Sequence, residues 1–283
     1  MSDLSARRRF FADEIAAVSG ISTNGLVEAL AEVPRERFLM PGPWLVKGEG
    51  DHFSGGRTTP DADPRHVYHN YAIAIDPARE LYNGNPAFLS TLIDRLVLRP
   101  GARVLHVGAG LGYYTALLGS TVGPSGRVVA IEVDSSLATQ ARENLSSMPW
   151  IDVTHGDALG PFRDSFDGIL VNAGVTHPLD SWLDALAPGG RMVLPLTVAM
   201  SGTIGKGIVV QIVKGADGQF AASFVTMVAI YSAVGLRDDA LNRGLGQVLR
   251  TNPFPKLRRL RRDAHDQTAS CWLHGSGCCF SLD

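Results

Sequence analysis

The chain has 283 residues, of which 45% are hydrophobic and 19% charged, and its 26 basic and 28 acidic side chains give a formal net charge of −2. This length suits one large domain or one domain with a small extension, and the composition is that of a globular protein. The balanced charge excludes a general attraction to nucleic acid or anionic membranes, although it allows a local basic patch.

The N-terminus lacks the apolar region of a signal peptide, because Asp13 and Glu14 interrupt the segment that follows three arginines. No stretch reaches the roughly 20 apolar residues of a membrane span. The three cysteines, Cys271, Cys278 and Cys279, are an odd and clustered set that does not describe a disulfide scaffold. We therefore expect a cytoplasmic protein with reduced thiols.

Residues 1–99 are predicted to form an N-terminal helical extension and a substrate-facing lid. Thr23 or Asn24 is the expected N-cap of the second helix. Residues 41–65 are rich in Gly, Pro, Asp and Thr, and we expect a long functional or mobile loop. The expected elements are helices over 4–19, 24–33 and 86–96 and a short strand over 71–75.

Residues 100–235 alternate between apolar strand-like runs and amphipathic helices, which predicts a doubly wound, mostly parallel α/β sheet with helices on both faces. Two β-rich runs then flank a turn at 215–218, so we expect an antiparallel C-terminal hairpin at the sheet edge. The predicted strands are 103–107, 127–133, 151–154, 166–172, 191–195, 206–214 and 219–231, and the predicted helices are 114–122, 137–146 and 180–186.

Residues 236–283 are expected to form a C-terminal helix and tail with a short strand over 270–273. The basic run Lys256–Arg262 is interpreted as a solvated helix face, with capture of an acidic peptide or of nucleic acid as the alternative. Because the adjacent pair Cys278–Cys279 fits poorly with the spacing of zinc sites, we expect free or partly buried thiols and no metal site.

Three closely spaced glycines, Gly108, Gly110 and Gly112, follow the first strand of the α/β region. Glycines there allow a tight turn and the close approach of a ligand at the end of the strand. The dinucleotide fingerprint G-x-G-x-x-G is broken by Tyr113, and the pattern is instead G-x-G-x-G. S-adenosylmethionine (SAM) has no pyrophosphate and does not need the dinucleotide spacing, so the pattern favours SAM over NAD.

Polar residues at the ends of the following strands support a cofactor site. Glu132 is placed to accept hydrogen bonds from ribose hydroxyls, Asp157 to meet an adenine amino group, and Asn172 ends the fourth strand. Their neighbours Val133 and Ala158 complete this set. Each position alone is as readily a solvated or structural residue. Together they predict that SAM is the cofactor and S-adenosylhomocysteine the product.

The segment Val33–Phe38, V-P-R-E-R-F, and the core stretch G-x-G-x-G-Y resemble the protein-L-isoaspartate O-methyltransferases, as do Gly156-Asp157, Phe166-Asp167 and Pro188–Arg191 downstream. The resemblance covers roughly residues 10–235. It implies a Rossmann-like methyltransferase that uses SAM to methylate an aspartyl- or isoaspartyl-type carboxylate on a peptide or protein.

The family's Ser-Gln-Pro or Thr-Gln-Pro substrate element corresponds here to Asn83-Gly84-Asn85-Pro86, with glycine at the hydroxyl position. We expect the amides of Asn83 and Asn85 to serve the acceptor carboxylate as the catalytic set, although Asn-Gly is also ordinary turn chemistry. Tyr82 and Gly84 are assigned to the cofactor set. Tyr68-His69-Asn70 departs from the tyrosine-plus-acid element of the family.

Other histidines give weaker hypotheses. His177 follows the fourth strand and either orients a substrate, acts as a base or is incidental, and His106 is expected in the core. The loop 41–65 and its surroundings match no strong metal motif, so a substrate lid is the preferred interpretation. The residues concerned are His52, His66, His69, Asp51, Asp61 and Asp63.

The sequence thus predicts a carboxyl O-methyltransferase acting on a peptide, a protein or a specialised metabolite, with no membrane partner. Two alternatives stay open. One is a nucleic-acid or small-molecule methyltransferase, suggested by the basic run. The other is a non-catalytic SAM-binding adaptor, suggested by the missing hydroxyl at Gly84.

Overall fold

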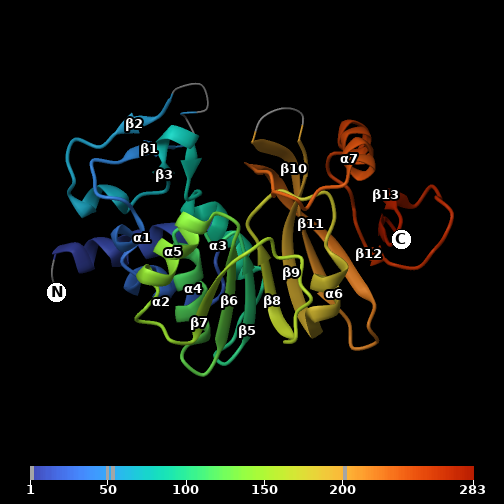
Figure 1. Cartoon of the computed structure of the whole chain (residues 1–283), viewed down its shortest axis with the longest axis horizontal. Coiled ribbons are helices and arrows are strands. Elements are labelled where there is room, and N and C mark those ends of the chain that lie inside the picture. Colours follow the sequence, from blue (N-terminus) through green and yellow to red (C-terminus); the bar gives the residue numbers. More distant parts are fainter. Residues whose placement is uncertain (1–2, 49–50, 52–54, 200–202) are drawn as a thin grey trace. The chain divides into compact units, whose positions relative to one another are not determined.

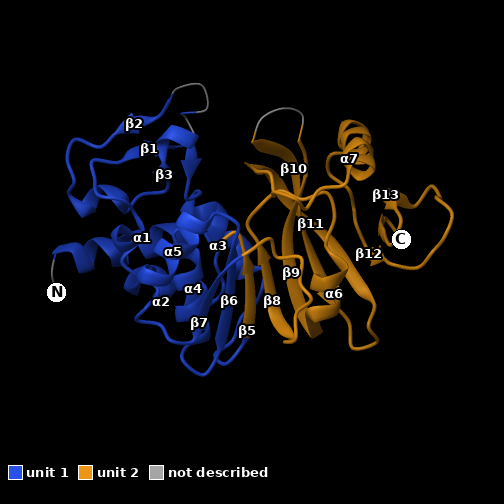
Figure 2. Ribbon diagram, viewed as in Figure 1, with its two compact units in different colours: residues 1–102, 109–155 blue, residues 103–108, 156–283 orange. Residues whose placement is uncertain are grey.

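The structure is a computed structural model that describes residues 3–48, 51, 55–199 and 203–283. The chain divides into two compact units, residues 1–102 with 109–155 and residues 103–108 with 156–283 (Figure 2). Each unit draws on two stretches of the chain, so these boundaries cut across the three segments expected from the sequence.

Helices dominate the first unit, where α1 packs on α2 and on α3, and α2 on α4 (Figure 1). Helix α3 begins where the Asn85 side chain accepts a hydrogen bond from the Phe88 N–H and Pro86 occupies the first turn. The helices are α1 (Asp3–Ser19), α2 (Asn24–Glu32), α3 (Pro86–Asp94), α4 (Tyr113–Val122) and α5 (Ser135–Asn144).

Thr23 is the N-cap of α2 as expected, but its side chain makes no capping hydrogen bond. The carboxylate of Asp94 instead accepts hydrogen bonds from the backbone N–H groups of Ser22 and Thr23. A residue distant in sequence therefore accepts the hydrogen bonds of the backbone N–H groups at the start of α2. A capping rule based on neighbouring residues cannot predict this contact.

The first unit also holds two groups of strands. An antiparallel sheet has the order β2-β1-β3-β4, and β6 (Arg127–Glu132) pairs in parallel with β7 (Ile151–His155). The expectation that 41–65 is only a loop is wrong, because Val46 is buried and pairs with Ile73. The strands of the small sheet are β1 (Leu45–Lys47), β2 (Arg57–Thr58), β3 (Ala72–Asp76) and β4 (Leu81–Tyr82).

In the second unit the strands follow the order β13-β14-β12-β11-β10-β9-β8-β5. β5, β8 and β9 run parallel, and the hairpin β10–β11 is antiparallel, so the mixed sheet confirms the predicted fold class. The turn at 215–218 closes with a hydrogen bond from the Gly215 N–H to the Gln219 carbonyl. These strands are β5 (Arg103–Val107), β8 (Phe166–Val171), β9 (Leu186–Val198), β10 (Ile204–Lys214) and β11 (Phe220–Tyr231).

The C-terminal part of the second unit contains α7 (Asp239–Thr251) and three short strands, and α6 (Asp180–Ala185) precedes β9. The basic run is not a helix, contrary to expectation: Arg259–Arg261 form β12, with Leu260 buried between two arginines. This alternation has the period of a strand. The other strands are β13 (Cys271–Gly275), which is longer than predicted, and β14 (Cys278–Ser281), which was not predicted.

Candidate functional site

A glycine turn follows β5 and leads into α4, as the sequence indicates. Gly108, Gly110 and Gly112 have φ of 86°, 55° and 96°, in the left-handed region that favours glycine. At Gly112, the N-cap of α4, a Cβ atom would lie 2.9 Å from Leu145 Cδ1. The turn therefore requires glycine for its backbone conformation, and at Gly112 also for space.

Glu132 lies at the end of β6 with only 7% of its surface exposed. Its Oε2 accepts a hydrogen bond from the Gly110 N–H at 2.7 Å, and its Oε1 accepts one from the Asp134 N–H at 3.0 Å. Each carboxylate oxygen keeps a further lone pair for a ligand. Next to it, Val133 is 44% exposed, which leaves an apolar surface beside a fixed carboxylate.

Three further predicted cofactor residues, Asn172, Asp157 and Ala158, belong to the second unit. Asn172 follows β8, and its backbone N–H donates to the Val107 carbonyl at 2.8 Å while its Nδ2 donates to the Gly108 carbonyl at 3.4 Å. Asp157 is exposed and accepts a hydrogen bond from the Leu159 N–H. Ala158 is buried at φ 58°, and its carbonyl accepts from Trp182 Nε1 at 2.8 Å.

The predicted acceptor segment, Tyr82–Pro86, begins at the last residue of β4 in the first unit. Both ends of the Asn85 amide are occupied, because Oδ1 caps α3 and Nδ2 donates to the Asn70 carbonyl at 3.3 Å. Asn83 Oδ1 accepts from the Ile73 N–H at 2.9 Å, whereas Asn83 Nδ2 is buried and has no hydrogen-bond partner among the described residues. Of the two asparagines, Asn83 therefore keeps a donor for a ligand.

Gly84 and Tyr82 flank this asparagine. Gly84 has φ 87°, its carbonyl accepts a hydrogen bond from Tyr114 Oη at 3.1 Å, and a Cβ there would lie 2.9 Å from Leu89 Cδ2. A serine or threonine at this position would thus be strained. Tyr82 is partly exposed, its pKa is raised by burial, and Lys47 Nζ lies 5.4 Å from its ring centroid.

Arg35, in the V-P-R-E-R-F motif, has a role that no local sequence pattern predicts. Arg35 is fully buried, and its guanidinium donates to the carbonyls of Val67, His69 and Tyr71 at 2.8, 3.1 and 2.9 Å. Its Nη2 also lies 3.5 Å from Asn83 Oδ1. This side chain therefore fixes the backbone that leads into the acceptor segment.

Of the histidines considered from the sequence, the structure describes His177, His106, His66 and His69. His177 is half-buried, burial lowers its pKa, and its Nδ1 lies 2.9 Å from Thr176 Oγ1. His106 is fully buried as expected, and burial lowers its pKa to about 4. His66 Nε2 contacts Asp61 at 2.9 Å and His69 stacks on Tyr71, while His52 lies outside the described residues.

Acidic groups pair with two of the five basic side chains in the run Lys256–Arg262. Arg262 contacts Asp184 at 2.6 Å and Asp180 at 2.9 Å, and Arg261 contacts Asp263 at 2.6 Å. Paired arginines offer less net charge to phosphates than a free basic stripe does. The arrangement weakens the case for a nucleic-acid partner.

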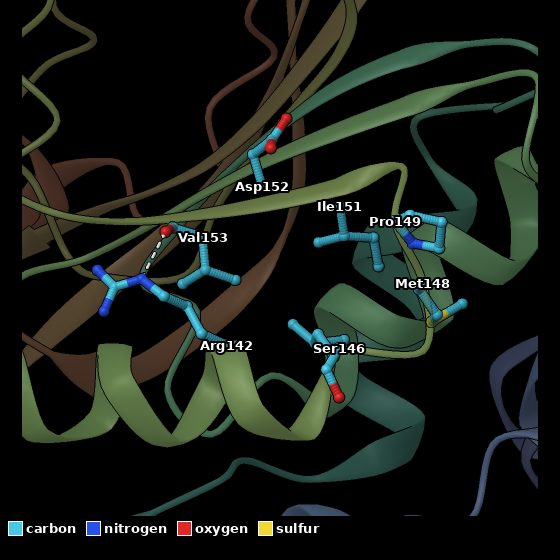
Figure 3. A pocket seen from close by; sticks show the side chains of 8 residues that line it. Arg142, Ser146, Met148, Pro149, Ile151, Asp152 and Val153 are labelled. Atoms are coloured by element: carbon cyan, nitrogen blue, oxygen red, sulfur yellow. Dashed lines mark hydrogen bonds between the residues drawn. The ribbon is translucent and has the colours of Figure 1, made fainter.

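A hollow of about 270 Å³ lies between the end of α5 and β7 in the first unit (Figure 3). Its polar side chains already have partners: Arg142 Nε donates to the Val153 carbonyl at 3.0 Å, Ser146 donates to a backbone carbonyl, and Asp152 pairs with Arg127. It contains none of the predicted site residues, so we assign it no function.

None of the helices in the described part of the chain has the length and apolar character of a membrane span.

The glycine turn and the carboxylate at the end of β6, in an α/β fold, are features of Rossmann-like nucleotide-binding enzymes. Solved protein-L-isoaspartate O-methyltransferases share this fold. One has a TM-score of 0.66 and 21% identity, with 89% of this chain and 73% of that chain covered.

A second, from Plasmodium falciparum in complex with S-adenosyl-L-homocysteine, has a TM-score of 0.60 and 16% identity, with 80% and 97% covered. The chain thus has the Rossmann-like fold of the class I methyltransferases. In sequence, residues 58–237 match the family model protein-L-isoaspartate(D-aspartate) O-methyltransferase. The protein-L-isoaspartate O-methyltransferase of Methanopyrus kandleri is 30% identical over 196 residues, which is 68% of this chain and 76% of that protein.

The chain belongs to the protein-L-isoaspartate(D-aspartate) O-methyltransferase family. The family, the fold class and the enzyme class expected from the sequence are therefore confirmed, and SAM is the methyl donor of this class. The roles of individual site residues stay predictions.

Proposed function

We propose that this protein transfers a methyl group from SAM to a carboxylate of an isoaspartyl-type residue in a peptide or protein. The observation that carries the proposal is the Glu132 carboxylate, fixed by the N–H groups of Gly110 and Asp134 beside a glycine turn. SAM supplies an electrophilic methyl group on a sulfonium. The substrate class rests on family membership and on similarity to proteins named for that activity.

In this proposal Glu132 accepts hydrogen bonds from the ribose hydroxyls, and the exposed Val133 packs against the adenine. The backbone freedom of Gly110 and Gly112 lets the ligand approach the turn closely. Gly108, Asp157, Ala158 and Asn172 stay as the sequence-predicted cofactor residues of the second unit, and Tyr82 and Gly84 as those of the acceptor segment.

The acceptor needs positioning more than activation. A carboxylate is deprotonated at pH 7, so its oxygen is nucleophilic without a general base. Asn83 Nδ2, which has no partner among the described residues, donates a hydrogen bond to this carboxylate. Asn85 acts as a helix cap that orients the segment. Exclusion of water and alignment for in-line displacement supply the rest of the rate.

The test is a binding titration with SAM and S-adenosylhomocysteine, followed by labelled-methyl transfer to an isoaspartyl peptide and to its aspartyl counterpart. We expect Glu132→Ala to weaken binding by about 100-fold or more, because two N–H donors lose their acceptor and the ribose loses its contacts. Asp152→Ala, an exposed carboxylate on β7, is the matched control. If the wild type binds neither ligand, or methylates both peptides equally, the proposal is wrong in its cofactor site or in its acceptor.

A further inference from the structure

Four side chains of metal-binding type converge in the C-terminal part of the second unit. They are His265 in the loop between β12 and β13, Cys271 and His274 on β13, and Cys279 on β14. One potential ligand atom from each lies within 4.8 Å of all the others. The cluster shares no residue with the proposed methyl-transfer site.

Strand register explains how the cluster forms. His274 and Cys279 are direct partners in the antiparallel pair β13–β14, so their side chains share a face. Cys271 and His274 are three residues apart, which would place them on opposite faces of a regular strand. The register shifts between Cys271 and Leu273, and such a bulge moves Cys271 onto the face of His274.

Contacts around the cluster orient its ligands as in known metal sites. His265 Nδ1 hydrogen-bonds to the Asp263 carbonyl at 2.8 Å, which assigns the proton to Nδ1 and leaves a lone pair on Nε2. That Nε2 lies 3.7 Å from Cys271 Sγ. The Thr268 N–H donates to the same sulfur at 3.3 Å. A metal-bound histidine typically anchors its second nitrogen on a carbonyl in this way.

Two further observations favour a ligand over simple packing. His274 Nδ1 is buried and has no hydrogen-bond partner among the described residues. An orphaned buried polar atom is costly and calls for an explanation, which a metal bond supplies. Cys278 is buried too, but as the neighbour of Cys279 on β14 its side chain points to the other face and it is not in the cluster.

We propose that His265, Cys271, His274 and Cys279 bind one Zn²⁺ in a closed, tetrahedral structural site. Two cysteines and two histidines are a standard zinc ligand set, and with Zn–S of about 2.3 Å and Zn–N of about 2.0 Å the ligand atoms lie roughly 3.3–3.8 Å apart. The 3.7 Å from Cys271 Sγ to His265 Nε2 fits this spacing.

On binding, Zn²⁺ replaces the two thiol protons, which pass to solvent, and two thiolates neutralise the ion. With four protein ligands no coordination position is left for a substrate, so the role is structural. The metal ties the loop that contains His265 to β13 and β14.

The first measurement is the zinc content of the full chain, purified without chelator, by mass spectrometry of the metal. We expect about one zinc per chain. In Cys271→Ser and Cys279→Ser we expect the zinc affinity to fall by more than about 100-fold. This loss exceeds the roughly 10–100-fold loss of affinity that is typical when a residue contacting a metal ligand, and not the metal itself, is replaced. The matched control is Cys278→Ala, which removes the adjacent thiol and keeps about one zinc.

A second measurement does not depend on how the variants fold. Wild-type protein stripped of metal and titrated with Co²⁺ is expected to develop thiolate-to-cobalt charge-transfer bands and the visible bands of tetrahedral cobalt, which Zn²⁺ then abolishes. Absence of zinc together with absence of these bands would overturn the proposal. A disulfide between Cys271 and Cys279 in protein freshly purified under reducing conditions, or equal zinc loss in Cys278→Ala, would overturn it as well.

Discussion

Glu132 with Gly110 and Gly112 of the glycine turn, and the acceptor segment Tyr82–Pro86, lie in the first unit. Both regions carry polar residues that the sequence suggested as ligands. At the turn, the Glu132 carboxylate is held by backbone N–H groups and keeps lone pairs for a ligand. In the acceptor segment most amide groups hold the protein's own backbone. In this chain the carboxylate at the strand end therefore keeps more hydrogen-bonding capacity for a ligand than the amides in the turn do.

The largest expected loss of stability comes from replacing Arg35, which fixes the backbone that leads into the acceptor segment. Arg35→Met removes the donors to three backbone carbonyls, and we expect the free energy of unfolding to fall by about 3 kcal/mol. Urea denaturation measures it. The control is Arg37→Met in the same motif, where the side chain is exposed and a change below about 0.5 kcal/mol is expected. Equal losses in both variants would show that Arg35 has no special role.

The glycine turn is tested at its helix. Gly112→Ala places a Cβ at φ 96° and 2.9 Å from Leu145 Cδ1, and we expect a loss of about 2 kcal/mol in the free energy of unfolding together with weaker SAM binding. Gly123→Ala at the other end of α4 has φ 67° but no atom within 4 Å. It is expected to cost about 1 kcal/mol and to leave SAM affinity unchanged. Thermal unfolding and SAM titration separate the two variants.

Asn83→Ala separates the two halves of the proposed reaction. We expect kcat/KM for an isoaspartyl peptide to fall about tenfold, equivalent to about 1.4 kcal/mol of lost acceptor binding, while the SAM dissociation constant stays the same. Steady-state kinetics with the peptide varied at saturating SAM provide the measurement. A loss of SAM affinity as large as the loss of kcat/KM would place Asn83 in the cofactor site instead.

The smallest expected effect concerns Asn85. Asn85→Ala removes the N-cap of α3 and is expected to lower the free energy of unfolding by about 1 kcal/mol, whereas Asn85→Asp keeps the cap. Both variants are expected to keep kcat/KM within about twofold at a temperature where they are folded. If Asn85→Ala loses activity as Asn83→Ala does, the two amides act together on the acceptor.

Much of the fold follows from local patterns in the sequence. Apolar runs separated by glycine turns predicted β5, β6 and β8, because buried parallel strands have that composition. The tight turn expected at Gly108, Gly110 and Gly112 is present, and all three glycines have positive φ. The end of β6 at Glu132 places the carboxylate beside this turn.

The features that could not be predicted from the sequence depend on contacts between residues distant along the chain. β1 forms within a Gly- and Pro-rich stretch because it pairs with β3, and β12 forms within a basic run because it pairs with β11 and β14. The Cys/His cluster was missed because the cysteines alone have no zinc-like spacing. A bulge and a loop histidine, neither visible in a local pattern, complete the ligand set.

β5 belongs to the second unit although the residues on both sides of 103–108 belong to the first. This arrangement bears on the order of folding. Gly108 and Asn172 hydrogen-bond across 64 positions of sequence, and residues 109–155, all of the first unit, lie between them. Parallel strands joined by so long a connection pair slowly, because loop-closure entropy must be overcome before any contact forms. We therefore expect the pairing of β5 with β8 to form late in folding, after the intervening residues of the first unit have collapsed.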